Sequence, residues 1–314
     1  MSLSNESYDA TTTDQWLVCA ACGTQFPTTD RTAVKTCDIC DDPRQFVPES
    51  GQSFTTVATL KASTNPQYHN VFTSYEADPR ITYIRTEPSV GIGQRATLIK
   101  TPKGNILWDC ITFLDDETIQ RIQNGGGLKA IVISHPHFYS AHVVWARAFD
   151  CPVYIASDDE KWTTMPSAHR QLLTETETEI LNTGVKAVKV GGHFPGSMVL
   201  LFDRHVFVAD TFMLTLAGVG DYDNDALGVQ RVERPPGLNT FTFMWSYPNM
   251  IPLPPDELAR MWAVISRYSF AAAHGSFVGR DLENVHVKAR LLESMQLQVR
   301  AMGHASHSLL KEVV

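Results

Sequence analysis

The stretch Ala130-Ile-Val-Ile-Ser-His135-Pro-His137 decides the fold. Its unbroken apolar run is typical of a strand buried on both faces, and two histidines follow at the strand's end. Because alternate residues at the end of a strand face the same way, His135 and His137 are expected to point into one site. A lone histidine there is usually a core or capping residue, whereas two at this spacing favour a metal site.

Further strands and helices are expected on both sides of this stretch. Short apolar runs bounded by turn residues predict strands at residues 81–84, 96–100, 105–109, 152–156, 187–190, 198–202 and 205–209. Helices are expected at residues 115–123, 141–149, 256–267 and 283–302. Hairpin strands followed by strand–helix alternation predict a layered α/β fold with mixed sheets. Residues 215–253, rich in Gly, Pro and Asn, read as a long inserted loop of the kind that is often functional.

Three more candidate metal ligands follow predicted strands or lie between them. His193 stands in the glycine-rich turn of residues 191–197. Asp210 closes the run that begins at His205, and His274 closes the small-residue run of residues 270–274. Each has an ordinary structural explanation when taken singly. Together with the histidine pair they place nitrogen and oxygen ligands at four strand ends.

The order of these ligands resembles that of the metallo-β-lactamase superfamily over roughly residues 70–280. That family carries a HxHxDH motif, then a glycine-flanked histidine, a strand-end aspartate and a late histidine. The resemblance implies an α/β four-layer αββα sandwich of two mixed sheets flanked by helices. It also implies a metal site made by His135, His137 and His193, with Asp210 beside it as ligand or bridge. Asp109 stands where the family has an aspartate that supports the site from behind, although a plain turn aspartate is the alternative.

The chain departs from the family motif at the second metal site. Tyr139 and Ser140 occupy the positions of the motif's Asp and His, which leaves His274 and a share of Asp210. Two protein ligands rarely hold zinc tightly, since catalytic zinc usually has three. His142 is a candidate substitute, but it lies two residues further on, about 200° around a helix, and this favours another direction. A single-metal centre is therefore expected.

The resemblance implies a metal-dependent hydrolase acting on a small organic molecule. Zinc on three histidines lowers the pKa of a bound water to about 7, and the resulting hydroxide would attack an ester, thioester, lactone or amide carbonyl. Asp210 would orient the nucleophile or carry its proton. Tyr139 would donate a hydrogen bond to the oxyanion or protonate the leaving group, or else only fill the vacated space. Two alternatives stay open, namely an iron oxidoreductase of the same fold and a non-catalytic binding module.

A second metal site is predicted near the N-terminus. Cys19-Ala-Ala-Cys22 and Cys37-Asp-Ile-Cys40 are two CxxC pairs separated by 14 residues. Two such turns supply the four thiolates of a zinc-ribbon-like site, which is structural because it leaves no position for substrate. We therefore expect a tail and zinc module at residues 1–48, with residues 1–14 disordered, and a metallo-β-lactamase-like domain at residues 49–314.

Composition limits the partners. The net charge is −8 and no basic run stands out, which argues against nucleic acid. No apolar run reaches the roughly 18 residues that cross a bilayer, and the polar N-terminus lacks the features of a secretory signal, so a cytoplasmic protein is expected. The aromatic-rich residues 239–248 are expected either to wall the pocket around a small-molecule substrate or to pack in the core. Nothing in the pattern specifies an oligomeric state.

Overall fold

A computed structural model describes residues 10–232 and 234–314 of the chain. Its first large sheet has seven strands in the order β10-β9-β8-β7-β6-β5-β4. In chain order these are β4 (His69–Ser74), β5 (Ile81–Glu87), β6 (Ala96–Ile99), β7 (Ile106–Trp108), β8 (Ala130–Val132), β9 (Val153–Ala156) and β10 (Arg170–Leu173). The strands β4 to β7 pair antiparallel and β7 to β10 pair parallel. The sheet is therefore mixed, as expected.

The second large sheet has six strands in the order β11-β12-β13-β14-β19-β20. They are β11 (Glu177–Glu179), β12 (Lys186–Lys189), β13 (Met198–Phe202), β14 (His205–Phe207), β19 (Ala272–His274) and β20 (Asp281–Glu283). Only the β14–β19 pair is parallel. The predicted helix of residues 283–302 begins later, at Val287, because Asp281–Glu283 forms the edge strand β20.

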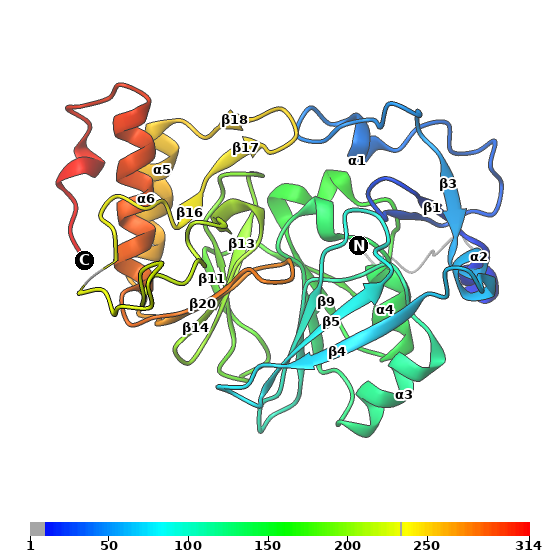
Figure 1. The fold of residues 1–314 in the computed structure, drawn as a ribbon. Helices are drawn as coiled ribbons and strands as arrows, with labels where there is room; N and C mark the ends of the chain where they lie inside the picture. Colours follow the sequence, from blue (N-terminus) through cyan, green and yellow to red (C-terminus); the bar gives the residue numbers. More distant parts are fainter. Residues whose placement is uncertain (1–9, 233) are drawn as a thin grey trace.

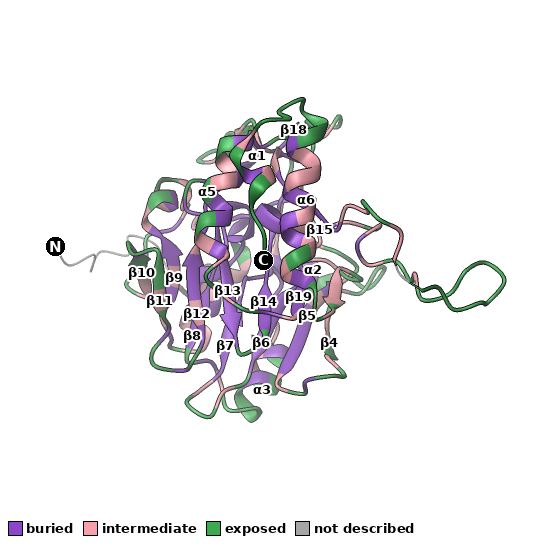
Figure 2. Ribbon diagram, turned by 90° about the vertical axis from the view of Figure 1, so that its left-hand side faces the viewer, coloured by how far each residue is buried: buried purple, intermediate pink, exposed green. Residues whose placement is uncertain are grey.

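Helices cover the outer face of each sheet (Figure 1). The pair α3 (Asp116–Asn124) and α4 (His142–Ala148) packs on the seven-stranded sheet, and α5 (Pro255–Ile265) and α6 (Val287–Ala301) pack on the other. Figure 2 shows the buried strands behind the half-exposed α5 and α6. The helix starts follow local chemistry, since the side chain of Asp115 caps α3 and Pro255 opens α5. This arrangement confirms the αββα sandwich.

Alternation along the strands builds separate cores. In β8, Ala130 and Val132 face the space between the sheets, whereas Ile131 faces α3 and α4. In β13, Leu200 faces the same inner space and Leu201 packs toward α5 and α6. Successive side chains of a strand point to opposite faces, so an all-apolar strand fits between two covered faces.

Two small two-stranded sheets lie at the ends of the inserted segment 215–253. They pair β15 (Met213–Leu214) with β16 (Phe241–Thr242) and β17 (Met244–Ser246) with β18 (Ile251–Pro252). The described residues also form short 3-10 helices: Ala10–Gln15, Pro136–Phe138, Ser157–Trp162, Asp210–Phe212 and Ser308–Lys311. The first of these corrects the predicted disorder for residues 10–14, because the adjoining Trp16 is buried against Val143 and Met165. The rest of the predicted tail, residues 1–9, lies outside the described residues.

The N-terminal module, called the cysteine module below because it carries Cys19, Cys22, Cys37 and Cys40, contains a three-stranded sheet with the order β2-β1-β3. It comprises β1 (Leu17–Cys19), β2 (Gln25–Phe26), α1 (Asp38–Asp41), β3 (Phe54–Thr56) and the adjoining α2 (Val57–Ala62). The sheet therefore extends past the predicted boundary at residue 48. It also packs on the large domain, since the Thr112 hydroxyl donates to the Gly23 carbonyl at 2.8 Å. Gly23 allows this approach, because a Cβ there would lie 2.5 Å from the Thr112 oxygen.

Candidate metal centres

Four buried side chains converge at one edge of the sandwich. His135 and His137 follow β8, His193 lies on the turn between β12 and β13, and Asp210 follows β14. The Oδ2 atom of Asp210 lies 3.4 Å from His135 Nε2 and 3.7 Å from both His137 Nδ1 and His193 Nε2. The His193 Nε2 and His137 Nδ1 atoms are 3.1 Å apart. Strand ends that are distant in sequence thus bring three nitrogens and one oxygen together.

These distances suit a metal ion. Ligands 2.0–2.1 Å from a tetrahedral zinc are about 3.3–3.4 Å from one another, within the observed range of 3.1–3.7 Å. The Asp210 Oδ1 atom is buried and has no hydrogen-bond partner among the described residues. Buried polar atoms are normally paired, so an unpaired oxygen on the carboxylate that faces three nitrogens indicates a site for a cation or for a water bound to one.

Neighbouring groups fix the histidine rings. The Ser134 hydroxyl is 2.8 Å from His135 Nδ1, and the Met244 carbonyl oxygen is 3.0 Å from His193 Nδ1. In each ring this contact turns the other nitrogen toward the cluster. Asp109 lies behind, where its Oδ1 accepts a 2.7 Å hydrogen bond from the Ser134 backbone N–H. It therefore holds the backbone next to His135, which is the supporting position expected for it.

A close backbone approach explains the glycines beside His193. Gly192 has a φ of +90°, and a Cβ there would lie 2.6 Å from the Thr211 hydroxyl oxygen. Glycine alone fits this conformation and this space. The turn can therefore lie directly against the Asp210 segment.

The protonation states suit metal binding. Burial lowers the pKa of His137 to about 4 and that of His193 well below its ordinary value. Burial alone would raise the pKa of Asp210, but the nearby histidines, His135 first, outweigh it and bring that pKa well below its ordinary value. Neutral imidazoles and an ionised carboxylate are the forms that bind metals.

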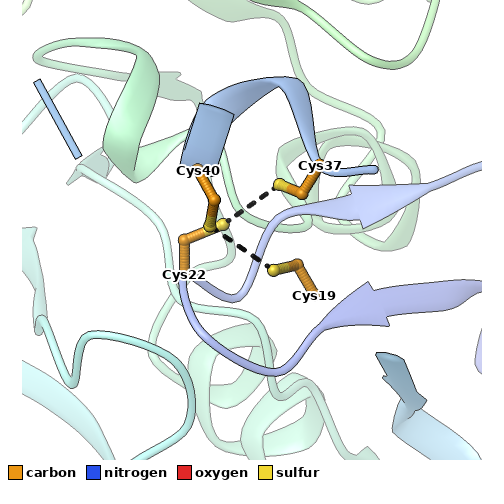
Figure 3. Close-up of side chains that lie close together, drawn as sticks. All are labelled: Cys19, Cys22, Cys37 and Cys40. Atoms are coloured by element: carbon orange, nitrogen blue, oxygen red, sulfur yellow. Dashed lines mark hydrogen bonds between the residues drawn. The ribbon is translucent and has the colours of Figure 1, made fainter. Parts of the chain in front are cut away.

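The four cysteines form the second centre (Figure 3). Cys19 and Cys40 have sulfurs 3.6 Å apart, as have Cys22 and Cys37. None forms a disulfide, and all four are buried. Thiolates 2.3 Å from a tetrahedral zinc are about 3.8 Å apart, so this cluster also has the geometry of a metal site. Among the described residues, these two clusters are the only groups of three or more His, Cys, Asp or Glu side chains whose ligand atoms converge.

A cavity of about 310 Å³ opens beside the histidine cluster and reaches His137, His193 and Asp210. Its other walls are mostly apolar: Phe46, Ile92, Met213, Tyr247, Pro248 and Phe277. Arg44 and Gln45 of the cysteine module also line it. No sequence pattern predicted a role for these module residues, because their contacts are made by irregular segments far apart in the chain. The aromatic residues 239–248 were expected either to wall the pocket or to pack in the core, and they divide between the two. Tyr247 lines the cavity, whereas Phe241 and Phe243 lie in the core.

Comparison with known proteins agrees with this architecture. A sequence profile described as the metallo-β-lactamase superfamily matches residues 91–255. An uncharacterized protein of Bacillus subtilis (strain 168), YmaE, is 35% identical over 262 residues, which is 83% of this chain and 88% of that protein. The chain belongs to the metallo-β-lactamase superfamily. Two solved structures share the fold with a TM-score of 0.50 and 15% identity, VMB-1 and the DIM-1 metallo-β-lactamase. They cover 74% and 73% of this chain and 98% of their own.

The described residues do not assemble the usual second metal site of the superfamily. Tyr139 has its ring buried, and its hydroxyl donates to the Asp159 carbonyl at 3.1 Å. The Ser140 hydroxyl accepts a 2.8 Å hydrogen bond from Gln94. Tyr139 is not among the residues that line the cavity, so the phenol cannot serve as the expected donor to substrate in this arrangement. The buried ring of Tyr139 fits the alternative prediction, in which this side chain only fills space.

The late histidine, predicted as a ligand, lies away from the cluster. His274 Nδ1 is 2.8 Å from the Tyr83 hydroxyl, and its Nε2 is 2.9 Å from His205 Nδ1. Both ring nitrogens are therefore occupied. The ring stacks on Phe207 between the sheets, because the register of β19 opposite β14 pairs His274 with Phe207. The structure thus corrects the assignment of His274 as a metal ligand.

His142 is not a ligand in this structure either. It begins α4 and is fully buried, and its Nδ1 lies 2.8 Å from the Tyr139 carbonyl oxygen. Its Nε2 has no partner among the described residues, yet no ligand atom of His142 joins the cluster. The physical reason is the helical rotation noted in the sequence, because two residues turn a side chain by about 200° and so direct His142 away from the cluster.

Proposed function

We propose that the chain is a hydrolase that uses a single metal ion held by His135, His137, His193 and Asp210. The observation that carries this proposal is the opening of the apolar cavity onto three of those four side chains. Zinc bound there would lower the pKa of a water and polarise a carbonyl group. We take zinc as the resident metal because the ligand spacing matches its tetrahedral geometry.

Asp210 has the central part in the proposed reaction. Its Oδ2 faces the three histidines, while its Oδ1 has no hydrogen-bond partner among the described residues. The free oxygen is available to accept a hydrogen bond from the attacking water and so to orient it. The Tyr247 hydroxyl donates to the backbone carbonyl of Asp210 at 2.7 Å, which holds the carboxylate's own residue in place. Asp210 would thereby orient the nucleophile, which is one of the two roles expected of it.

The cavity favours a small substrate with an apolar acyl or aryl group. Phe46, Met213 and Phe277 offer carbon surface, and a volume of about 310 Å³ is at the lower end of ligand pockets. An ester, thioester, lactone or amide with such a group would bring its carbonyl to the cluster. A large polymer would not fit within these walls.

Iron is the second candidate metal. Three nitrogens and one oxygen complete a tetrahedron, and closed tetrahedral sites are typical of structural zinc. An ion with six positions would keep two for oxygen or substrate, as in the histidine–carboxylate iron oxygenases. The four-ligand cluster therefore also favours an oxidoreductase. In the zinc proposal, the attacking water would reach the centre from the cavity side, where His137, His193 and Asp210 line the wall.

One experiment separates these possibilities. The purified protein is analysed for its metals and assayed with 4-nitrophenyl acetate, butyrate and benzoate, a thioester and a γ-lactone, with oxygen uptake recorded in parallel. We expect zinc, ester or thioester turnover, and a loss of at least 100-fold in His135→Ala. Iron with oxygen uptake would establish the oxidoreductase instead. Turnover that His135→Ala leaves unchanged would remove the histidine centre from the reaction.

A further inference from the structure

The cysteine module reaches the histidine centre through the segment that follows α1. Cys40 lies in α1, and Arg44 comes four residues later. The opposite loop holds this segment, since the Ser246 hydroxyl donates to the Arg44 carbonyl at 3.1 Å. The Asn249 side chain donates to the Pro43 carbonyl at 3.0 Å. In Figure 1 the segment after α1 meets the loop that joins β17 to β18.

The Arg44 side chain contacts the backbone of a metal-site residue. Its Nε donates a 2.9 Å hydrogen bond to the carbonyl oxygen of His193. The guanidinium also lies 4.4 Å from the centre of the Phe194 ring, at cation–π distance. The same Phe194 ring lies 4.9 Å from the His137 ring. Arg44 therefore braces both the turn that carries His193 and the ring packed against His137.

Asp42 fixes the guanidinium from behind. Both its oxygens accept from Arg44 Nη1 at 2.8 Å, and its Oδ2 also accepts from Trp162 Nε1 at 3.2 Å. The two charged side chains are only 14% and 11% exposed. A shielded ion pair is costly to break, because the remaining partner would be a poorly solvated charge. Arg44 is thus held in one orientation by the module from which it comes.

We infer that Arg44 is a positioning residue of the histidine metal centre, through which the cysteine module fixes the turn that bears His193. No sequence feature of the superfamily profile covers it, because the matched segment begins at residue 91. Groups that orient metal ligands without touching the metal change affinity by about 10- to 100-fold when removed. The inference requires a metal at the histidine centre but not hydrolysis, so it is tested by metal binding alone.

The test uses the full-length protein with zinc left in the cysteine site and cobalt(II) in the histidine site. A chelator first strips the histidine site, and cobalt is then titrated back. The visible ligand-field spectrum reports the geometry, and the absence of a thiolate charge-transfer band shows that cobalt has not entered the cysteine site. Arg44→Gln should raise the Kd for cobalt about tenfold and shift the ligand-field band. Retained zinc and an unchanged far-ultraviolet circular dichroism spectrum show that the variant is folded.

A matched control is available in this chain. Arg80 pairs through two oxygens with Asp78, also two residues earlier, and lies 4.6 Å from the centre of the Phe202 ring. Arg80→Gln breaks a more exposed arginine–aspartate pair, in which Arg80 also bonds Asp203, and should leave the cobalt Kd and spectrum as in the wild type. A folded Arg44→Gln protein with the wild-type Kd and band would overturn the inference.

A milder variant decides the matter if Arg44→Gln does not fold. Asn249→Ala removes the side chain of an exposed residue that donates hydrogen bonds to the Pro43 and Gln45 carbonyls, and it keeps the Arg44–Asp42 pair. A Kd raised at least twofold supports the inference, and a wild-type Kd with an unshifted band contradicts it.

Discussion

Arg44 Nε and the His193 carbonyl oxygen are joined by a 2.9 Å hydrogen bond between residues 149 positions apart. This contact links two metal centres that lie in different parts of the sequence. The cysteine module is consequently part of the architecture of the histidine centre, because it supplies Arg44, Gln45 and Phe46 to the walls of the adjoining cavity.

Removal of residues 1–49 should therefore damage the large domain. The deletion uncovers Phe113, which packs against Val18, and Val143, which packs against Trp16. Each large apolar side chain newly exposed to water costs about 1.5–3 kcal/mol. We expect a poorly soluble product, or one with a lower melting temperature and a weaker histidine centre. A truncated chain with the full-length melting temperature and metal affinity would show that the module is independent.

Cys40→Ser should weaken both metal centres. One thiolate is lost from the cysteine cluster directly, and α1, which carries Cys40, also leads into the Arg44 segment. Metal content before and after mild chelation measures the effect. Cys151→Ser is the matched control, because it removes a buried thiol that lies outside the cluster. Loss from the cysteine site with full retention at the histidine site would argue against coupling.

His142→Gln should leave the histidine-centre metal in place and reduce acid sensitivity. Burial lowers the pKa of His142 to about 4, whereas an unfolded histidine has a pKa of about 6.5. The unfolded chain therefore binds the proton more readily, and the folded state loses up to about 3 kcal/mol as the pH falls from 6.5 to 4. Urea denaturation at pH 7.5 and pH 5 should show a smaller drop for the variant than for the wild type.

His137→Gln is the matched variant at a ligand position and should release the metal. If His142→Gln released it equally, His142 would be a ligand after all. An equal pH-dependent drop in His142→Gln and wild type would show that the residue is not forced to stay neutral by the fold.

The two tyrosines near the centre should behave differently. Tyr139→Phe removes one buried hydrogen bond, to the Asp159 carbonyl, and should cost about 1 kcal/mol of stability without changing kcat. Tyr247→Phe removes the hydrogen bond to the Asp210 carbonyl and should lower kcat severalfold, since Asp210 is then less well held. Steady-state kinetics on both variants checks this. A lowered kcat in Tyr139→Phe alone would restore the phenol as a candidate donor.

Much of the site could be predicted because it depends on strand ends. An apolar run followed by His135 and His137 specifies both the strand and the direction of its ligands. The positions of His193 and Asp210 follow from the glycine turn and from the end of β14. These are local patterns, and the order of strands in the superfamily brings them together.

The prediction for His274 was wrong, and the role of Arg44 was not predicted, for reasons that lie outside local sequence patterns. His274 ends a strand as expected, but its direction depends on the register of β19 opposite β14 and on partners such as Tyr83. A side chain's face follows from the register, which the local sequence of β19 does not reveal. Arg44 is harder still, because an arginine after a CxxC pair is ordinarily a surface residue. Only the packing of the module on the large domain gives it a role.

Metal stoichiometry tests the central claim most directly. Elemental analysis of the intact protein should find two metal ions per chain, one for each converging cluster. His193→Ala should retain only the ion of the cysteine cluster, and Cys37→Ser should lose that ion. Three ions per chain would contradict the single-metal centre, and two ions retained in His193→Ala would contradict the centre itself.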